Sequence, residues 1–172
     1  AWLTPRDIDW SWRAPAEQAV VFLLIDEQHH IPTQACSRRW VRQLMSISAV
    51  QSLGQVELEF EPAAQCLTVH ELVVWRLDAD GAWRKRTPVA REAFLLRQRE
   101  QQLEQQMLNG RVSLVALMED VRIGDLIDLA WTVVPLETLP GLAFTTYSHF
   151  AWQAAVAHAS FTLHLDRVIS CT

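Results

Sequence analysis

The stretch QVELEFEPAAQCLTVHELVVWRL, residues 55–77, decides the fold class. In its first part, apolar residues alternate with glutamates; the apolar ones are Val56, Leu58 and Phe60. A period of two is typical of a strand that buries one face and leaves the other in water. Pro62 has no backbone N–H for the sheet ladder and ends the strand. The glutamates are interpreted as an exposed strand face, because paired catalytic carboxylates must face each other across a cleft.

The segment 67–77 predicts a second strand. Most of its apolar residues fall on one face: Leu67, Val69, Val73, Trp75 and Leu77. Leu72 and Val74 point the other way, so the middle of this strand should be covered on both sides. Asp80 and Gly81 form a turn signal, because glycine tolerates positive φ, and residues 83–86 are expected to return as the partner strand of a hairpin.

Further segments have the composition or alternation of strands; they are 20–26, 37–48, 112–117, 126–134 and 160–169. In the last of these, Phe161, Leu163 and Leu165 alternate with polar residues, which predicts one buried face. A tight turn is expected over 120–125, where Gly124 supplies an unusual φ and Asp125 can accept bonds from nearby backbone N–H groups.

Residues 89–108 differ in composition from the rest of the chain. They are rich in Arg, Glu, Gln and Leu, contain no glycine or proline, and are followed by Asn109 and Gly110, a good helix stop. This favours a helical insertion, with a long pair of strands as the alternative. The fold class expected is therefore all-β in the main, an antiparallel β-sandwich with one helical insertion around residues 89–108.

The chain of 172 residues, half of them apolar, is long enough for one domain without disulfides or metals. The first part, 1–19, mixes tryptophan, proline and charge without a period and is interpreted as an irregular arm, with 20–172 as a single domain. A net charge of -5 gives no basic face for nucleic acid. The longest apolar run, 19–25, is far shorter than a membrane-spanning helix requires.

The residues that could carry chemistry do not form a recognisable site in the sequence. Cys36, Cys66 and Cys171 lie far apart and form no CxxC pair, and none of them is predicted to lie beside a histidine at a helix start. The adjacent pair His29 and His30 is interpreted as a solvated turn, since neighbours on an extended chain point to opposite sides. No catalytic residue, metal or cofactor is expected.

Eight tryptophans are a large number for this length. Trp75 and Trp131 alternate with apolar neighbours and are expected in the core, whereas Trp10, Trp12 and Trp83 are candidates for an exposed interaction surface. Docking of the arm onto its own domain is the alternative for the tryptophans that it carries.

The order of features is similar to that of one known family. FEP precedes LTVHELVVWR, then come Asp80-Gly81, the Arg/Glu/Gln/Leu segment, Asn109-Gly110, and EDVRIGDLIDLAWTVVP. This resembles the N-terminal domain of unknown function that precedes transglutaminase-like domains in many bacterial proteins, over roughly 20–150. Leu108, where an aromatic residue is expected, departs from the pattern.

The resemblance implies a β-sandwich in an exported, periplasmic or membrane-attached protein, with the Cys-His-Asp machinery in the domain that follows. This chain would then be a fragment without catalytic residues that positions that domain or presents substrate to it. The alternative is a stand-alone module that binds a glycan or peptide through exposed tryptophans. Intrinsic activity of Cys36 or Cys66 is a third, weaker hypothesis.

Overall fold

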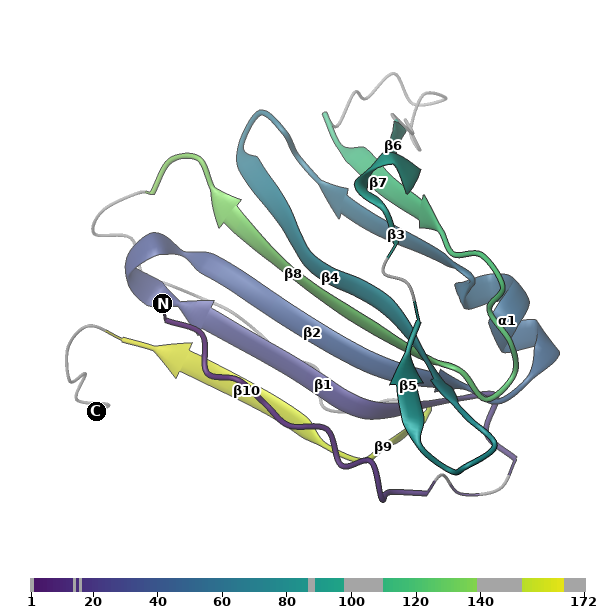
Figure 1. Ribbon diagram of the computed structural model, residues 1–172. Coiled ribbons are helices and arrows are strands. Elements are labelled where there is room, and N and C mark those ends of the chain that lie inside the picture. The colour runs from purple at the N-terminus through teal and green to yellow at the C-terminus, as the bar shows by residue number, and fades with distance from the viewer. Residues whose placement is uncertain are drawn as a thin grey trace.

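The computed structural model describes residues 2–13, 15, 17–86, 89–97, 110–138 and 153–165, which form two β-sheets packed as a sandwich (Figure 1). The larger sheet has the order β10-β1-β2-β8-β4-β5, with β9 also paired to β1. Its strands are β1 (Val20–His30), β2 (Ala35–Leu44), β4 (Gln65–Leu77), β5 (Trp83–Lys85), β8 (Leu126–Pro135), β9 (Ala155–Val156) and β10 (Ala159–His164). The smaller sheet has the order β3-β7-β6, from β3 (Gln55–Phe60), β7 (Val112–Leu117) and β6 (Phe94–Arg97).

The prediction of a mainly β, largely antiparallel sandwich is confirmed. The exceptions to antiparallel pairing are β9 and β10, which both run parallel to β1 at the edge of the larger sheet. One short helix, α1 (Ile47–Leu53), and two 3-10 turns, Ile31–Thr33 and Arg91–Ala93, complete the described elements. No helix among the described residues is long and apolar enough to cross a membrane.

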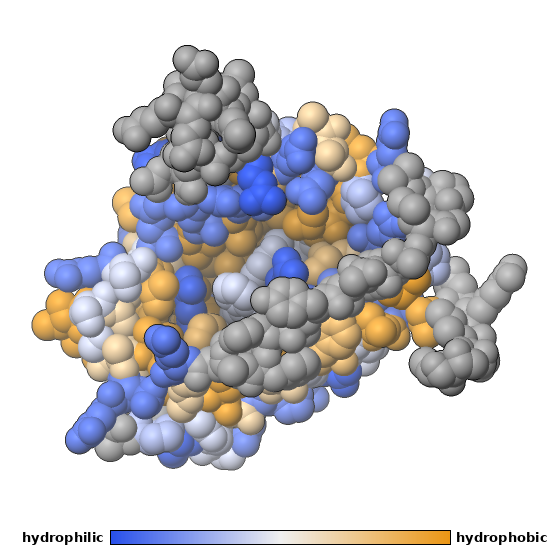
Figure 2. Space-filling view, turned by 180° about the vertical axis from the view of Figure 1, so that it is seen from behind, coloured by the Kyte–Doolittle hydropathy of each residue, from blue (hydrophilic) through white to orange (hydrophobic). Residues whose placement is uncertain are grey.

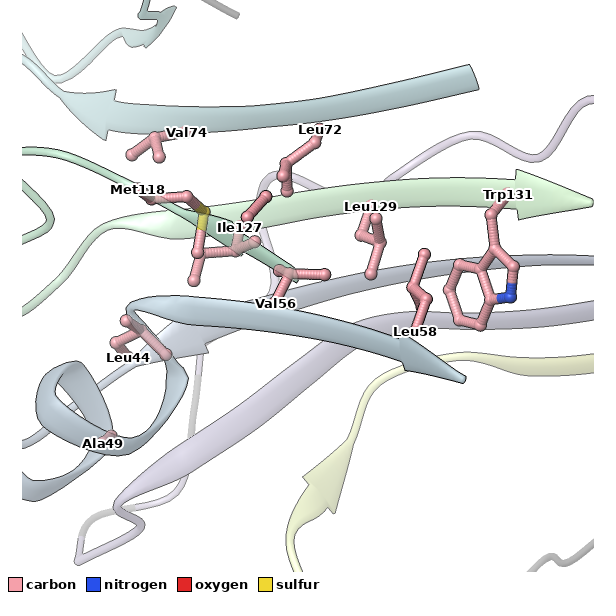
Figure 3. Close-up of a cluster of buried hydrophobic side chains, with 11 residues drawn as sticks. Leu44, Ala49, Val56, Leu58, Leu72, Val74, Met118, Ile127, Leu129 and Trp131 are labelled. Carbon is pink, nitrogen blue, oxygen red and sulfur yellow. The ribbon is translucent and has the colours of Figure 1, made fainter. Parts of the chain in front are cut away.

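The sandwich interior is filled from both sheets (Figure 3). Val56 and Leu58 of β3 are buried, and they point toward Ile127, Leu129 and Trp131 of β8, while Glu57 and Glu59 between them are exposed. The apolar face of β3 therefore packs on the larger sheet, and its alternate residues face solvent, as the sequence pattern predicts. The buried part of this cluster draws on β2, β4 and β8 of the larger sheet but contains no residue of β1.

The opposite face of the larger sheet carries a second cluster. Its buried members come from β1, β2 and β8, and partly buried side chains of the N-terminal arm pack on them: Ile8, Trp10 and Trp12. The arm has no helix or strand over 2–13. It crosses the front of the larger sheet in Figure 1.

Two details of secondary structure differ from the favoured expectation, and in the first the strand alternative holds for Phe94–Arg97. Residues 91–97 form a 3-10 turn and the edge strand β6, not a helix, because pairing with β7 provides the backbone hydrogen bonds; residues 98–108 lie outside the described part. The strand expected over 37–48 ends at Leu44, and α1 follows, with the Ser46 side chain accepting a bond from the N–H of Ala49 at 3.1 Å.

Two strands present faces that differ from those expected. In β4 the register shifts between Val69 and Glu71, so Leu72 and Val74 join the face of Leu67 and Val69 in the sandwich interior. In β10, Leu163 is 47% exposed, and Leu165 just after it is 43% exposed. The predicted continuation of this strand to Ile169 lies outside the described residues.

Candidate functional site

The turn between β7 and β8 is held by one arginine of β4. Gly124 has a φ of +91°, the left-handed region that glycine enters without strain. Asp125 is only 2% exposed and accepts two bonds from Arg76, Nε to Oδ1 at 2.8 Å and Nη2 to Oδ2 at 2.7 Å. The N–H of Arg122 donates to Asp125 Oδ2 at 2.8 Å. The turn is thus attached to β4 of the larger sheet by an ion pair that contains two hydrogen bonds.

Asp120 extends this network to the surface. Arg122 Nε donates to its Oδ1 at 2.9 Å, and Arg76 Nη1 lies 3.0 Å from its Oδ2. These hydrogen bonds, that of Arg122 first, hold the pKa of the Asp120 carboxyl below its ordinary value. The pKa of the Arg76 guanidinium is raised, mainly by its hydrogen bonds to Asp125 and then by that to Asp120. Asp120 and Arg76 therefore stay charged at neutral pH.

A groove opens beside this turn. It has a volume of about 460 Å³ and combines an apolar floor with a charged rim. Its lining residues are Val74, Arg76, Arg86, Val89, Ala90, Ala93, Leu117, Met118, Glu119 and Asp120. Leu117 is 66% exposed, and Ile123 in the turn is 53% exposed. An apolar centre inside a polar rim is typical of a protein interaction surface.

The hairpin of β4 and β5 forms the next part of this end of the molecule. Gly81 has a φ of +79° and its N–H donates to the carbonyl of Asp78 at 2.9 Å, while Asp80 Oδ1 accepts from the N–H of Ala82 at 3.0 Å. Gly110, before β7, also has positive φ, at +64°, and Asn109 lies outside the described residues. Asp80 and Gly81 therefore build the reversal that the sequence indicates.

The tryptophans singled out in the sequence gather on the second cluster. The ring of Trp10 lies 5.0 Å from that of Trp75 and 5.9 Å from that of Trp83, and Trp12 packs on the same cluster. Trp10, Trp12 and Trp83 are each half-buried. The geometry favours docking of the arm onto its own domain. A role for these three side chains in binding a partner stays a prediction.

The structure brings together a cysteine and a histidine that sequence reasoning kept apart. His29 is buried within β1, not in a solvated turn, and its Nε2 lies 3.8 Å from Cys36 Sγ on β2. The same Nε2 lies 2.6 Å from Glu27 Oε1. The interpretation of His29 as part of a solvated turn was therefore wrong. The missing signal was the short connection over 31–34, which closes a hairpin and places residue 29 opposite residue 36.

This arrangement does not activate the cysteine as a nucleophile. Burial raises the pKa of the Cys36 thiol to about 11, and the nearby Arg38 offsets this only in part. A catalytic triad also needs the histidine to reach the thiol through one ring nitrogen and its orienting group through the other. Here the thiol and the Glu27 carboxylate both lie at Nε2. The raised pKa keeps Cys36 a neutral thiol at pH 7. Cys66 is exposed.

From behind, the molecule shows hydrophobic residues in a hollow near the centre of the face, with hydrophilic residues around it (Figure 2). A second cavity, of about 390 Å³, lies where β2 begins and β3 ends. Its lining includes Cys36, Arg38, Glu59 and Arg111. It is more polar in its lining residues than the groove beside Asp120, and no nucleophile with its base lines either cavity among the described residues.

Comparison with known proteins identifies the family. The family model described as "Domain of Unknown Function with solved-structure structure (DUF3857)" matches residues 33–169, and the chain belongs to this family. No curated protein matches the chain. The crystal structure of a candidate protease from Parabacteroides distasonis ATCC 8503 has a similar fold, with a TM-score of 0.53 and 16% sequence identity. The match covers 68% of this chain and 23% of that one.

Proposed function

We propose that this member of the DUF3857 family is a non-catalytic accessory domain of a longer protein, in which it positions a downstream transglutaminase-like Cys-His-Asp domain or presents substrate to it. The main support is the fold match to a segment that makes up 23% of a candidate protease. A fold that recurs as a minor part of a larger chain fits an accessory role. The neutral thiol of Cys36 and the absence of an assembled nucleophile among the described residues fit the same role.

The surface best suited to contact the neighbouring domain is the groove beside the 120–125 turn. Its lining includes Met118, which is buried, and Leu117, the last residue of β7, which is exposed. Arg76 and Asp125 fix the turn rigidly, so little ordering entropy would be lost when a partner binds. An interface between domains of one chain buries roughly 600–1,500 Å².

Hydrogen exchange tests this proposal in the full-length protein. Backbone amides of β7 and of the 120–125 turn are expected to exchange more slowly in the full chain than in the 172-residue segment alone. The edge strand β10 serves as the internal reference, because it lies at the opposite edge of the larger sheet from β5. Equal exchange at the groove in both proteins contradicts the proposed docking surface.

A pair of matched variants sharpens the test. Leu117→Glu places a charge at the groove, whereas Leu163→Glu places the same charge at an exposed position on β10. In the full-length protein, Leu117→Glu is expected to remove the exchange protection of the groove and to lower the activity of the downstream domain. Leu163→Glu should leave both unchanged. A downstream domain that behaves identically with and without this one overturns the accessory role.

A further inference from the structure

We propose that Glu27, His29 and Cys36 form a binding site for a zinc ion at the β1–β2 hairpin. One ligand atom from each of the three residues lies within 4.8 Å of the other two. A thiolate, an imidazole and a carboxylate are the three ligand types that zinc takes in proteins, and softer thiolate ligation disfavours magnesium and calcium. This site is separate from the groove and does not depend on the accessory role proposed above.

The strand pairing explains why these residues share one face. His29 and Cys36 are direct partners in the antiparallel register of β1 and β2, so their side chains lie on the same side of the sheet. Glu27 is two residues before His29 on the same strand and therefore points to the same side. A sheet thus holds all three ligands on rigid backbone, which limits the ordering cost of binding a metal.

The distances are close to those of a metal centre. Zinc bonds of about 2.3 Å to sulfur and about 2.0–2.1 Å to nitrogen give a sulfur–nitrogen separation of roughly 3.6 Å in a tetrahedron. The observed separation of Cys36 Sγ and His29 Nε2 is 3.8 Å. The hydrogen bond of 2.6 Å from His29 Nε2 to Glu27 Oε1 must open by several tenths of an ångström to admit the ion.

Arg38 provides the outer support that such ligands need. Its Nε donates to Glu27 Oε2 at 3.1 Å, whereas Oε1 faces His29. Glu27 can therefore ligate through Oε1 while Oε2 keeps its arginine partner, the arrangement that orients metal-binding carboxylates. Burial disfavours the charged carboxylate, but the hydrogen bonds from Arg38 and His29 outweigh it and lower the pKa of Glu27, so this ligand is already ionised at neutral pH.

The site has an approach from solvent and a free coordination position. Cys36 and Arg38 line the cavity of about 390 Å³ where β2 begins and β3 ends. Three protein ligands leave the fourth position of a tetrahedral ion for water from this cavity. Glu59 and Arg111, which line the same cavity and lie 3.7 Å apart, largely cancel each other's charge.

Metal binding releases one proton. The Cys36 sulfur loses its proton to solvent as the metal–sulfur bond forms, and the Glu27 carboxylate has none to lose. The neutral imidazole donates from Nε2 to Glu27 without metal, and it exchanges that proton through solvent for one on Nδ1 as Nε2 binds the ion, with no net release. The apparent affinity should therefore rise about tenfold per pH unit between roughly pH 7 and 8.5, while the unbound thiol stays protonated. The groups that face the thiol across this range are Glu27, His29 and Arg38, with Glu59 and Arg111 across the cavity.

Titration with Co²⁺ tests the site directly. The protein is prepared with Cys66→Ser and Cys171→Ser, so that Cys36 is the remaining thiol. Co²⁺ is expected to bind one per chain with a sulfur-to-cobalt charge-transfer band in the near ultraviolet, and Zn²⁺ is expected to abolish that band by displacement. A protein that gives no such band, or that binds several ions weakly without it, overturns the proposal.

Variants separate ligation from general folding. Cys36→Ser and His29→Gln are each expected to weaken Zn²⁺ binding by at least about 100-fold, and Arg38→Gln by roughly 10–100-fold, as is usual when a supporting partner is lost. Cys66→Ser alone is the matched control and should bind as the wild type does. Thermal unfolding in the absence of metal checks that each variant is folded. Cys36→Ser with unchanged Zn²⁺ affinity and a folded state contradicts the proposal.

Discussion

The two faces of the larger sheet are stabilised in different ways. Toward the smaller sheet, the buried side chains of the cluster in the sandwich interior are apolar, and residues of β3 and β7 pack against them. Toward the N-terminal arm, apolar residues near β1 and β8 lie beside buried charge, with Asp128 fully buried and paired to Arg39 at 2.7 Å. One face is sealed by another sheet, with the Glu27–Arg38 ion pair beside the apolar cluster, and the other by an irregular segment and the buried Asp128–Arg39 pair.

The difference follows from what each cover can provide. A sheet presents regular side chains and satisfies its own backbone, so its partner face can be apolar throughout. The arm forms no strand over 2–13, so its backbone N–H and C=O groups require polar partners on the sheet instead. Arg39 donates to the carbonyl of Arg6, and Gln28 exchanges two hydrogen bonds with the backbone of Thr4. Polar and charged residues are therefore buried on this face because an irregular segment covers it.

The largest loss is expected on the apolar face. Trp131 is 6% exposed and packs edge-to-face on Trp40 with ring centroids 5.1 Å apart. Trp131→Ala removes that contact and leaves a cavity, at a cost of about 4 kcal/mol in the free energy of unfolding. Urea denaturation of both proteins measures it. A loss below roughly 1 kcal/mol would mean that the two sheets move together to fill the cavity, and that the interior is not rigidly packed.

The next largest effect is expected on the face covered by the arm. Arg39→Ala leaves Asp128 buried without its partner and removes the bond to Arg6, at a cost of about 3 kcal/mol. Arg84→Ala, in an exposed ion pair with Asp78 at 2.7 Å, is the matched control and should cost less than about 1 kcal/mol. An equal loss of unfolding free energy in the two variants would mean that the buried ion pair stabilises the fold no more than an exposed one.

Removal of a tryptophan from the arm tests how firmly the arm is docked. Trp10→Ala eliminates its contacts with Trp75 and Trp83, and we expect a loss of about 1–2 kcal/mol, since the ring is only half-buried. The exposed Leu77, near the tip of the same hairpin, is the control, with Leu77→Ala expected near zero. Limited proteolysis of the arm should speed up in Trp10→Ala only. An unchanged cleavage rate contradicts docking through this side chain.

The smallest effect concerns acid stability. The pKa of Glu27 is lower in the folded chain than its ordinary value of 4.5, since hydrogen bonds from Arg38 and His29 outweigh burial. Its contribution is therefore fully present above pH 4.5 and is lost as the pH falls through the folded pKa. Glu27→Gln should flatten the fall in unfolding free energy below pH 5, measured by urea denaturation at several pH values. Glu57→Gln, on an exposed strand face, should leave that slope unchanged.

Local pattern was sufficient for most of the strands. The alternation at Val56 and Leu58 and the hairpin signal at Gly81 depend on neighbours in the sequence, and the structure has strands and a reversal at those positions. The short helix α1 was missed, although Ser46 and Gly54 flank it as caps. In this case the apolar residues between 37 and 48 continued the strand pattern and concealed the helix start.

Features that depend on pairing across the chain could not be predicted. Residues 91–97 have helical propensity, and β6 forms because β7 is available beside it. The parallel pairing of β10 with β1 joins segments more than 130 residues apart, and no local signal specifies it. The same holds for Cys36 and His29, whose contact requires the exact register of a hairpin that the sequence did not delimit.

The contacts between the arm and β10 have a consequence for the order of folding. Arg6 donates to Thr162 at 3.0 Å, and the ring of Trp2 lies 5.3 Å from that of His164. On the ribosome, Arg6 emerges 156 residues before Thr162, so this contact must wait until β10 has been made. Trp10 can reach Trp75 and Trp83 earlier, whereas the contact of Trp2 with His164 must wait for β10. Closing contacts of such long sequence separation makes this last part of docking a slow, late step.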